Sequence, residues 1–579
     1  MIGESIMILK QTKYYLSSAV LSTILLTGCG GGSSSTSPTD DTEENITTPI
    51  IEESLSITEE YQVTPLALEG EESVNLHIKV ETDTPKDLYL VFSNTATDSS
   101  ASVNIEQSSK YAISSAQKSS VSASTPKITP TPEKIRSFNA KLLKPDSNTL
   151  SSNPKVILVK NERSEGDTKT FYLDLDDSGA STNATLKKII ANIETEFGSR
   201  TLNIWVSDDS FDSGSGCEKE RCVTQEMVDA LASTFLQTDP SNDIYDWVTN
   251  VFGKEWGSDA QEKYSNLIGE SGEINILLTD IDNDNATNGG VIGYFYSKDN
   301  YSTDSLSGSN EMIMFYIDSV LFANGDDEWD MEDYWPKETV STLAHEFQHM
   351  IHFYQKTILR TNGEQTDTWL NEMLSETIEE VISTKIHHIG PRGVDYTDGS
   401  AGESGNIYGR YPLFNEYNML SLTSWNNYYA DYSKVNAFGA YLTRNYGVGV
   451  LHDIMQSSYV HEDAVEYAIN NTANGEGKNF DDLLQEWGIA VILSDHDDLD
   501  ADTPTYNTGD FIESSFGDTT YDLGSINFFN YDPQPTIYTT GGTIQPQGNY
   551  YYKIGENISG TLDVNITLNG TTNVTLIAK

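Results

Sequence analysis

The sequence predicts an α+β fold, with strands prevailing in the first half of the chain and helices in the second. In the first half, apolar residues alternate with polar ones or form short apolar runs, as strands require. The longest amphipathic helical patterns begin at about residue 337, next to a metal-binding motif. With 579 residues the chain exceeds what one hydrophobic core organises, so several domains are expected.

The first 28 residues have the features of a signal peptide. A short positive region precedes a mostly apolar stretch over residues 14–26, which is too short to span a membrane. The stretch ends at Leu26-Thr27-Gly28-Cys29, which resembles the lipobox of bacterial lipoproteins. We therefore expect a lipid on Cys29 and an extracytoplasmic, lipid-anchored protein of a bacterial cell envelope, on the outer membrane or cell surface. An ordinary cleaved signal with an unrelated cysteine is the alternative.

Two regions of different composition follow the signal peptide. Residues 29–54 are rich in glycine and serine and then in threonine and acids, which is typical of a flexible, self-repelling tether. Residues 55–154 form a β-rich N-terminal region, with period-2 alternation over 74–80. A Ser/Thr/Lys/Pro-rich stretch over 108–134 interrupts it as a linker or long loop. The sequence leaves open whether this region is a propeptide or a spacer.

Residues 155–503 are expected to form the catalytic domain, and residues 504–579 a small C-terminal β domain. In the latter, residues 562–568 alternate before an Asn-Gly turn signal. Within the catalytic region the patterns predict helices at 184–197, 223–236, 337–354, 368–384, 437–445, 461–470 and 480–493, and strands at 202–206, 275–279 and 312–317.

The net charge argues against some classes of binding partner. With 34 basic and 88 acidic residues, the net charge is −54, which repels nucleic acid and anionic lipid headgroups. Nucleic acid is therefore not an expected partner.

Once Cys29 carries a lipid, Cys217 and Cys222 are the remaining cysteines, and outside the cytoplasm a small disulfide loop is expected.

The segment His345-Glu346-Phe347-Gln348-His349 contains the His-Glu-x-x-His motif. On a helix, His345 and His349 lie one turn apart on one face, so both imidazoles can reach a single ion. Zinc–nitrogen bonds of about 2.0–2.1 Å fit this spacing without distortion. Glu346 lies beside them, close enough to take a proton from a water molecule on the metal.

A third ligand is expected on the next predicted helix. Glu372 follows His349 by 23 residues, which leaves room for a loop and a return onto an adjacent helix. Two histidines and one glutamate leave the fourth position of a tetrahedral zinc open, as catalytic sites require. We expect Glu376, one turn later, to hold the outer nitrogen of a ligand histidine, with Asn371 also in the surrounding shell. A solvated helix face is the alternative interpretation of the two glutamates.

These motifs resemble the gluzincins and, in the strings over 345–353 and 367–372, the hyicolysin family of neutral zinc metallopeptidases. The similarity extends from about residue 155 into the C-terminal β region. The strand-rich first half and helical second half, which meet at the metal motif, themselves indicate a zincin-type catalytic domain with a strand-rich upper half and a helical lower half, flanked by the small β-rich regions. The resemblance implies that His345, His349 and Glu372 bind zinc and that Glu346 is the base; it implies nothing definite about substrate.

Other candidate residues have weaker support. Gluzincin aminopeptidases have a tyrosine in a similar downstream helix, which makes Tyr432 the candidate for stabilising the oxyanion, with His387 and His388 as rivals. The stretch 289–295 is either an edge strand that pairs with extended substrate or an ordinary glycine-rich hairpin. Oxygen ligands alternate over 280–285, and acids crowd the residues before the motif helix, so a structural calcium is a further hypothesis.

Together these features predict a zinc-dependent endopeptidase that hydrolyses peptide bonds in extracytoplasmic proteins and is held at a membrane by its N-terminal lipid. The alternative from another class is a surface adhesin or binding lipoprotein whose zinc site is structural or vestigial. A binding protein needs no base, so the intact Glu346 favours turnover. Hydrolysis of another kind of carbonyl compound is a third possibility that the core site does not exclude.

Overall fold

The computed structural model describes residues 50–66, 68, 72–107, 129–145, 163–237, 243–325, 328–388, 409–496, 499, 502–507, 509–513 and 519–579. The expected signal peptide, Cys29 and most of the expected tether lie outside these ranges. The chain divides into compact units at residues 1–47 and 48–579, and every element below belongs to the second. In the described ranges, no helix is long and apolar enough to cross a membrane.

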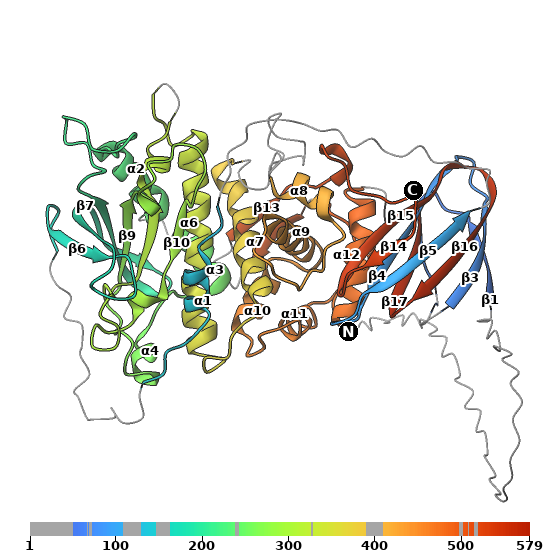
Figure 1. The fold of residues 1–579 in the computed structure, drawn as a ribbon, viewed down its shortest axis with the longest axis horizontal. Coiled ribbons are helices and arrows are strands. Elements are labelled where there is room, and N and C mark those ends of the chain that lie inside the picture. The colour runs from blue at the N-terminus through green and yellow to red at the C-terminus, as the bar shows by residue number, and fades with distance from the viewer. Residues whose placement is uncertain are drawn as a thin grey trace, which may run out of the picture. The chain divides into compact units, whose positions relative to one another are not determined.

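The fold is α+β, as predicted, and its first half contains a six-stranded sheet (Figure 1). Its strands, in spatial order, are β10 (Gly293–Phe295), β11 (Met314–Asp318), β9 (Glu273–Thr279), β8 (Gly198–Ser207), β7 (Ser181–Thr195) and β6 (Thr168–Tyr172). β8, β9 and β11 are parallel, whereas β10 is antiparallel to β11 and forms the edge of the sheet. The edge position of β10 matters for the site described below.

The helix predicted over 184–197 is wrong, because these residues belong to the strand β7. Apolar residues recur there at helical spacing, but β7 pairs with β8 through two register shifts, at Leu186/Lys188 and Ile190/Ile193. Each shift breaks the strict alternation of a strand by displacing the residues that follow it. After the shifts, the apolar residues recur with a period close to that of a helix. The sequence alone therefore does not distinguish this strand from a helix, whereas its pairing with β8 does.

The second half of the catalytic region is helical. Its helices are α6 (Tyr334–His352), which continues as a π-helix (Phe353–Ile358), α7 (Thr368–Ile386), α8 (Arg410–Tyr417), α9 (Tyr429–Tyr446), α10 (Gly449–Gln456), α11 (Asp463–Ile469) and α12 (Phe480–Leu493). Shorter or earlier helices are α2 (Gln225–Phe235), α3 (Ile244–Phe252), α4 (Ser258–Lys263) and α5 (Ser319–Phe322). Apart from 184–197, the predicted helices are confirmed. Their ends differ by at most three residues, except that α9 begins at Tyr429, eight residues before the predicted start at 437.

The motif helix α6 lies between the sheet and the other helices. One side of α6 packs against β10 and β11, and the other packs against α7, which in turn packs against α9. A Cβ added to Gly439 of α9 would lie 1.8 Å from Thr377 Oγ1 of α7, so these two helices approach as closely as only glycine allows. Tight packing on both sides holds α6 and α7 in a fixed relation.

Strands from the two ends of the described chain form a β-sandwich. One sheet has the order β1-β3-β16-β5-β14 and the other β15-β4-β17-β2, and a single hydrophobic core contains residues of both. The strands are β1 (Ile50–Ile57), β2 (Gln62–Leu66), β3 (Glu72–Val80), β4 (Lys86–Asn94), β5 (Ala101–Gln107), β14 (Gly542–Ile544), β15 (Gly548–Ile558), β16 (Gly560–Asn569) and β17 (Thr572–Ala578). A further pair, β12 (Gly509–Glu513) and β13 (Thr519–Leu523), stands apart from both sheets.

The expectation of two separate flanking β regions is therefore corrected. Ile566 of β16 is paired with Val74 of β3 on one side and with Ile105 of β5 on the other. Neither terminal region alone has enough strands to cover its apolar faces, so each supplies neighbours for the other. β1 also begins at Ile50, inside the stretch expected as tether.

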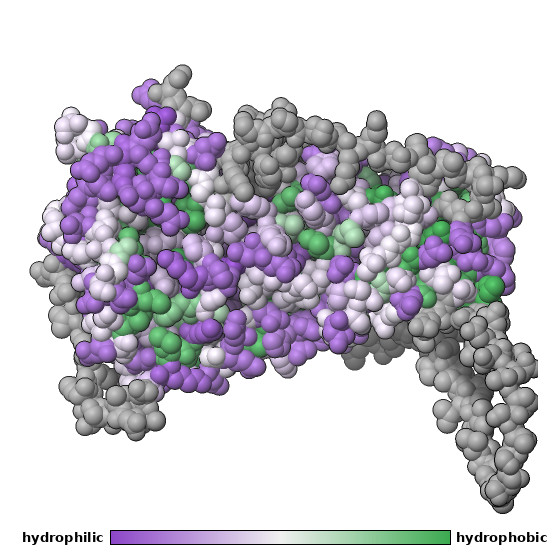
Figure 2. All heavy atoms as spheres, viewed as in Figure 1, coloured by the Kyte–Doolittle hydropathy of each residue, from purple (hydrophilic) through white to green (hydrophobic). Residues whose placement is uncertain are grey.

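The surface agrees with the acidic composition. On the face shown in Figure 2, hydrophobic residues gather only in small groups among hydrophilic ones. That face therefore offers no broad apolar area.

Candidate metal centre

Helix α6 brings His345 and His349 to one face, as the spacing predicts. Their Nε2 atoms lie 3.1 Å apart, and His345 is buried. The opposite face of the helix is held by apolar residues, among them the fully buried Leu343, Phe347 and Met350. Core packing of one face thus aims the two imidazoles away from the core and toward α7.

Glu372 of α7 completes a compact set of three ligand atoms. Its Oε2 lies 3.4 Å from His345 Nε2 and 3.6 Å from His349 Nε2. Tetrahedral coordination with bonds of about 2.0–2.1 Å separates neighbouring ligand atoms by about 3.3 Å. The three observed separations bracket that value, so the set fits one zinc-sized ion without rearrangement.

The electrostatics of these groups also fit a cation. In the described part of the chain, Glu372 Oε2 is buried and faces no hydrogen-bond donor other than the two histidine nitrogens. Although burial opposes it, the neighbouring His349 and His345 hold the pKa of Glu372 well below its usual range. The carboxylate is therefore ionised, as a metal ligand must be.

A second carboxylate of α7 orients His345. Glu379 Oε1 lies 2.5 Å from His345 Nδ1, and the other oxygen of Glu379 accepts a hydrogen bond from Ser341 Oγ at 3.0 Å. This pair leaves His345 Nε2 free to face the metal position. Glu379 was missed in the sequence, although it could have been found as a carboxylate two helical turns after Glu372.

The expected role of Glu376 is corrected by this geometry. Glu376 Oε1 lies 4.0 Å from His345 Nδ1, and its two oxygens instead accept hydrogen bonds from Arg410 at 2.6 and 2.8 Å. On an ideal helix, a residue seven positions after Glu372 is rotated from it by only about 20°, whereas a residue four positions after is rotated by about 40°. Glu379 is therefore better aligned with the ligand than Glu376.

Glu346 lies beside the two histidines and could itself contribute an oxygen to an ion bound there. Its Oε2 accepts a hydrogen bond from the backbone N–H of Phe295 at 2.7 Å, and its Oε1 accepts one from the Thr131 hydroxyl at 3.5 Å. Its carboxylate comes within 4.8 Å of the ligand nitrogens of both histidines. Burial raises the pKa of Glu346. These properties suit a proton acceptor placed next to a metal ion.

Tyr432 of α9 is brought to the same place. It is 5% exposed and lines a small cavity together with His345, Glu346 and Arg410. Burial and the charge of Glu372 raise its pKa well above the ordinary value, so its hydroxyl stays protonated and can donate a hydrogen bond. The Trp425 ring, 4.9 Å from the tyrosine ring, holds it in place.

The remaining candidates differ in their placement. Asn371 lines a larger cavity beside Glu372, and its buried Oδ1 has no hydrogen-bond partner in the described part of the chain. His388 is paired with Glu338 at 2.7 Å, and His387 caps the end of α7. Neither of these histidines lines the two cavities at the ligands, so Tyr432 is the better placed of the three.

The larger cavity, of about 380 Å³, gives access to the ligand set. Its lining combines groups from the metal site, from α1 (Glu133–Asn139) and from the loop before α9; they include Glu346, His349, His352, Glu372, Arg136 and Trp425. The edge strand β10, which forms the C-terminal part of the glycine-rich stretch 289–295, lies against α6. We refer to this cavity and the open edge of β10 together as the cleft.

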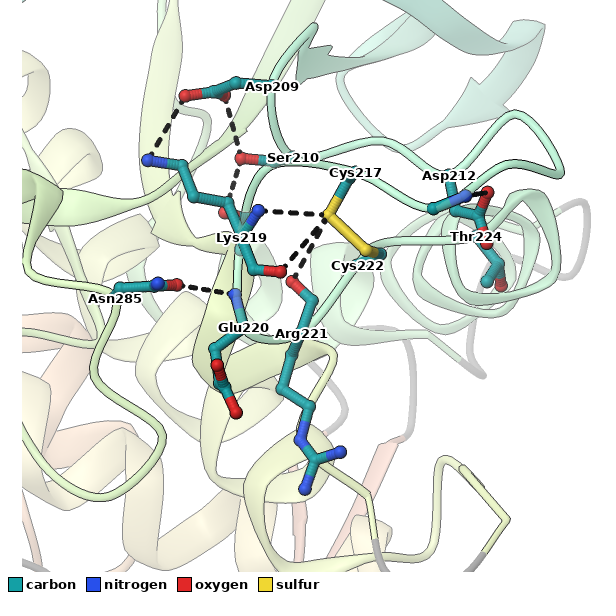
Figure 3. Close-up of a disulfide and its surroundings, with 12 residues drawn as sticks. Asp209, Ser210, Asp212, Cys217, Lys219, Glu220, Arg221, Cys222, Thr224 and Asn285 are labelled. Carbon is teal, nitrogen blue, oxygen red and sulfur yellow. Dashed lines mark hydrogen bonds and ion pairs between the residues drawn. A yellow bond between two sulfur atoms is a disulfide. The ribbon is translucent and has the colours of Figure 1, made fainter.

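The disulfide and the first candidate calcium loop lie in one region (Figure 3). Cys217 and Cys222 are bonded to each other. Between them, Lys219 Nζ lies 2.9 Å from Asp280 Oδ2 and 3.2 Å from Asp209 Oδ2. A lysine ammonium thus neutralises the first carboxylate of the loop, which leaves the calcium hypothesis without support there. In the second acidic stretch, residues 326–327 lie outside the described ranges.

Comparison with known proteins supports a metallopeptidase. The sequence profile of the family described as Peptidase M30 matches residues 179–496, which is more than half of the chain and contains every residue of the ligand set. Over 282 residues the chain is 25% identical to the neutral metalloprotease ShpI of Staphylococcus hyicus. That match covers 48% of this chain and 53% of the relative, so it spans about half the length of each.

Proposed function

This chain belongs to the peptidase M30 family, and on that premise we propose that it is a zinc-dependent endopeptidase acting on proteins outside the cytoplasm. The observation that carries the proposal is the buried set of His345 Nε2, His349 Nε2 and Glu372 Oε2, whose mutual distances are 3.1, 3.4 and 3.6 Å. Beside this set lies a buried carboxylate, Glu346, with the reach of a general base.

The metal would be held by these three side chains, with Glu379 fixing the orientation of His345. When bound, zinc lowers the pKa of its water and polarises a substrate carbonyl. The donor set, with two neutral imidazole nitrogens and one carboxylate, is the combination that catalytic zinc prefers. Cations that require only oxygen ligands fit it less well.

Three groups of the chain would then carry the proton transfers and stabilise charge. Glu346 takes a proton from the attacking water and passes it to the leaving amine, while the Phe295 N–H holds its carboxylate in place. Tyr432, protonated at neutral pH, donates to the oxyanion that develops on the scissile carbonyl. Protonation of the amine prevents the broken bond from re-forming.

An extended peptide is the substrate class that the cleft favours. β10 is an edge strand, so main-chain groups on its outer side, apart from the Phe295 N–H that holds Glu346, can pair with a peptide laid along it. The net charge of −54 disfavours nucleic acid as a partner. We further propose that a lipid on Cys29 anchors the enzyme to the bacterial cell envelope, with residues between Cys29 and Ile50 as the tether.

The test is digestion of unfolded casein by a soluble form that begins at residue 48, so that β1 is retained. Initial rates are compared with those of Glu346→Gln, and the metal content of each protein is measured. We expect the wild type to cut faster than the variant, a chelator to stop it and zinc to restore it, while Glu346→Gln binds zinc normally. Equal rates for both metal-loaded proteins, also when each carries Phe138→Ala and Asn139→Ala, would contradict the proposal and favour a surface adhesin with a structural zinc site.

A further inference from the structure

A segment from the N-terminal part of the chain lies across the cleft. Residues 129–145, here called the cleft segment, contain the short helix α1, which Figure 1 shows beside α6. In sequence this segment precedes the first strand of the six-stranded sheet by more than 20 residues, and its residues 129–134 had been expected to belong to a linker or long loop. The structure instead places it against both the sheet edge and the metal site.

On the sheet side, the cleft segment takes up main-chain groups near and along β10. Thr129 N donates to Gly290 O at 2.7 Å. The Asn139 side chain donates from Nδ2 to Phe295 O at 2.7 Å and accepts at Oδ1 from Ser297 N, also at 2.7 Å. Of these three groups, Phe295 O belongs to the edge strand through which an extended peptide would bind, and Gly290 O and Ser297 N flank that strand on either side.

On the metal side, the cleft segment reaches the proposed base. The Thr131 hydroxyl donates to Glu346 Oε1, and Thr131 lines both cavities at the ligand set. Arg136 of α1 lines the larger cavity opposite Glu372, with its guanidinium carbon 6.0 Å from the centre of the Trp425 ring. The cleft segment therefore bridges the strand-rich and helical sides of the site.

Packing holds the cleft segment in this position. Ile135 is 3% exposed, and the Phe138 ring lies 5.5 Å from the Tyr296 ring and 6.2 Å from the Tyr301 ring. Further along, Leu143 N donates to Tyr301 Oη at 3.0 Å. A helix of seven residues is not stable alone in water, so these contacts determine its order.

The cleft segment does not present a cleavable bond to Glu346. Thr131, the residue nearest the base, stands between Pro130 and Pro132, whose rings fix φ and lack an N–H. The carbonyl of Pro132 accepts hydrogen bonds from Ile135 N and Arg136 N, and the chain then continues as a helix. Within residues 129–145 no β-strand is present, so at Glu346 the segment presents a proline-flanked threonine rather than a strand paired with β10.

We propose that the cleft segment is an intramolecular inhibitor that keeps this peptidase latent until the segment leaves the cleft. The inference rests on the proposed function, because inhibition presupposes a peptide-cutting site. Asn139 of the segment takes up the Phe295 carbonyl of β10, and the segment forms one wall of the cavity, so a substrate laid along β10 would have to displace it. Release follows when a protease hydrolyses a peptide bond between residues 107 and 163, on either side of the segment.

The sandwich limits how the inhibitor can be removed. β3 and β5 flank β16, and β4 lies between β15 and β17, so the strands before residue 107 belong to a core shared with the C-terminal strands. Removal of the whole N-terminal region would strip β16 and β17 of their partners. A cut or excision between residues 107 and 163 leaves both sheets complete.

The test weakens the anchors of the segment in the full-length chain. Phe138→Ala combined with Asn139→Ala removes the ring contacts and both side-chain hydrogen bonds of Asn139 to the sheet edge; we call this double variant the open-cleft background. Lys141→Ala, at an exposed lysine of the same segment, is the matched control. Each protein is checked for one metal ion per chain, and casein hydrolysis is measured.

A second readout does not depend on catalysis. A labelled synthetic peptide with the sequence of residues 129–145 is titrated against Glu346→Gln, with and without the open-cleft substitutions, and fluorescence anisotropy is recorded. We expect the peptide to bind the open-cleft protein roughly tenfold more tightly, since the tethered copy no longer holds the site. We also expect casein hydrolysis to rise roughly tenfold in the open-cleft protein and to stay at the wild-type rate in Lys141→Ala.

Peptide binding and casein hydrolysis test the inhibitor role of the segment separately from the peptidase function. Equal peptide binding with and without the open-cleft substitutions would overturn the inference, as would open-cleft casein hydrolysis no faster than that of an active wild type. Tighter peptide binding in a metal-loaded, open-cleft protein that still does not cut casein would support the inhibitor assignment for the cleft and refute the peptidase.

Discussion

Replacing Glu379 by glutamine tests which residue of α7 orients the candidate ligand His345. Glu379 Oε1 lies 2.5 Å from His345 Nδ1, and both side chains are buried, so the charge of the carboxylate acts on the imidazole with little screening. Glutamine keeps the size of the side chain and one acceptor oxygen but loses the charge. Changes of this kind cost about 10- to 100-fold in metal affinity, or about 1.4–2.7 kcal/mol.

The assay is competition for zinc against a chromophoric chelator at neutral pH. Glu376→Gln is the matched control, since Glu376 lies on the same helix but 4.0 Å from His345 Nδ1. We expect the control to change zinc affinity by less than about threefold. It should instead lower the free energy of unfolding by about 3–5 kcal/mol, because Arg410 loses its buried partner. If Glu376→Gln weakens zinc binding more than Glu379→Gln does, the assignment of the orienting carboxylate is refuted.

Two further predictions follow from buried groups. Tyr432→Phe should lower kcat on casein by about 10²- to 10³-fold with zinc affinity unchanged, since it removes only the donor to the oxyanion; an unchanged kcat would exclude that role. Burial, with a smaller contribution from Arg360, lowers the pKa of Lys356 to about 7. Between pH 7.5 and 9, Lys356 is therefore mostly deprotonated in the folded chain and still protonated in the unfolded chain. Stability should therefore rise by about 2 kcal/mol over that range through this group, and urea denaturation of Lys356→Met should lack this part of the rise seen in the wild type.

Local patterns predicted the features that depend on a single helix. The i,i+4 spacing of His345 and His349 places two imidazoles on one face whatever surrounds the helix, and the buried strands β8, β9 and β11 were recognisable from their apolar runs. Glu372 was recognisable as well, because a catalytic site with two histidines needs one more ligand from a nearby helix. For the histidines and the strands the deciding geometry spans a few residues, whereas Glu372 lies 23 residues after His349 and was predicted from the number of ligands that zinc needs.

Other features depend on contacts between distant parts of the chain. Whether Glu376 or Glu379 meets His345 is decided by how α7 is rotated against α6, which the packing around Gly439 and other close contacts determines. β7 is distinguished from a helix only by its bulged pairing with β8.

The same holds for the sandwich and for the cleft segment. The partners of β16 lie some 460 to 490 residues earlier in the chain, at Val74 and Ile105. Thr131 meets Glu346 across 215 residues. The sequence by itself predicted the candidate metal ligands and the proposed base: helical spacing brings the two histidines together, and the ligand number of a catalytic zinc site calls for a third residue. Only the tertiary structure decided which residues surround and cover them. Strand pairing and the placement of the cleft segment bring together residues that are far apart in the chain, and no periodic pattern in the sequence marks such pairs.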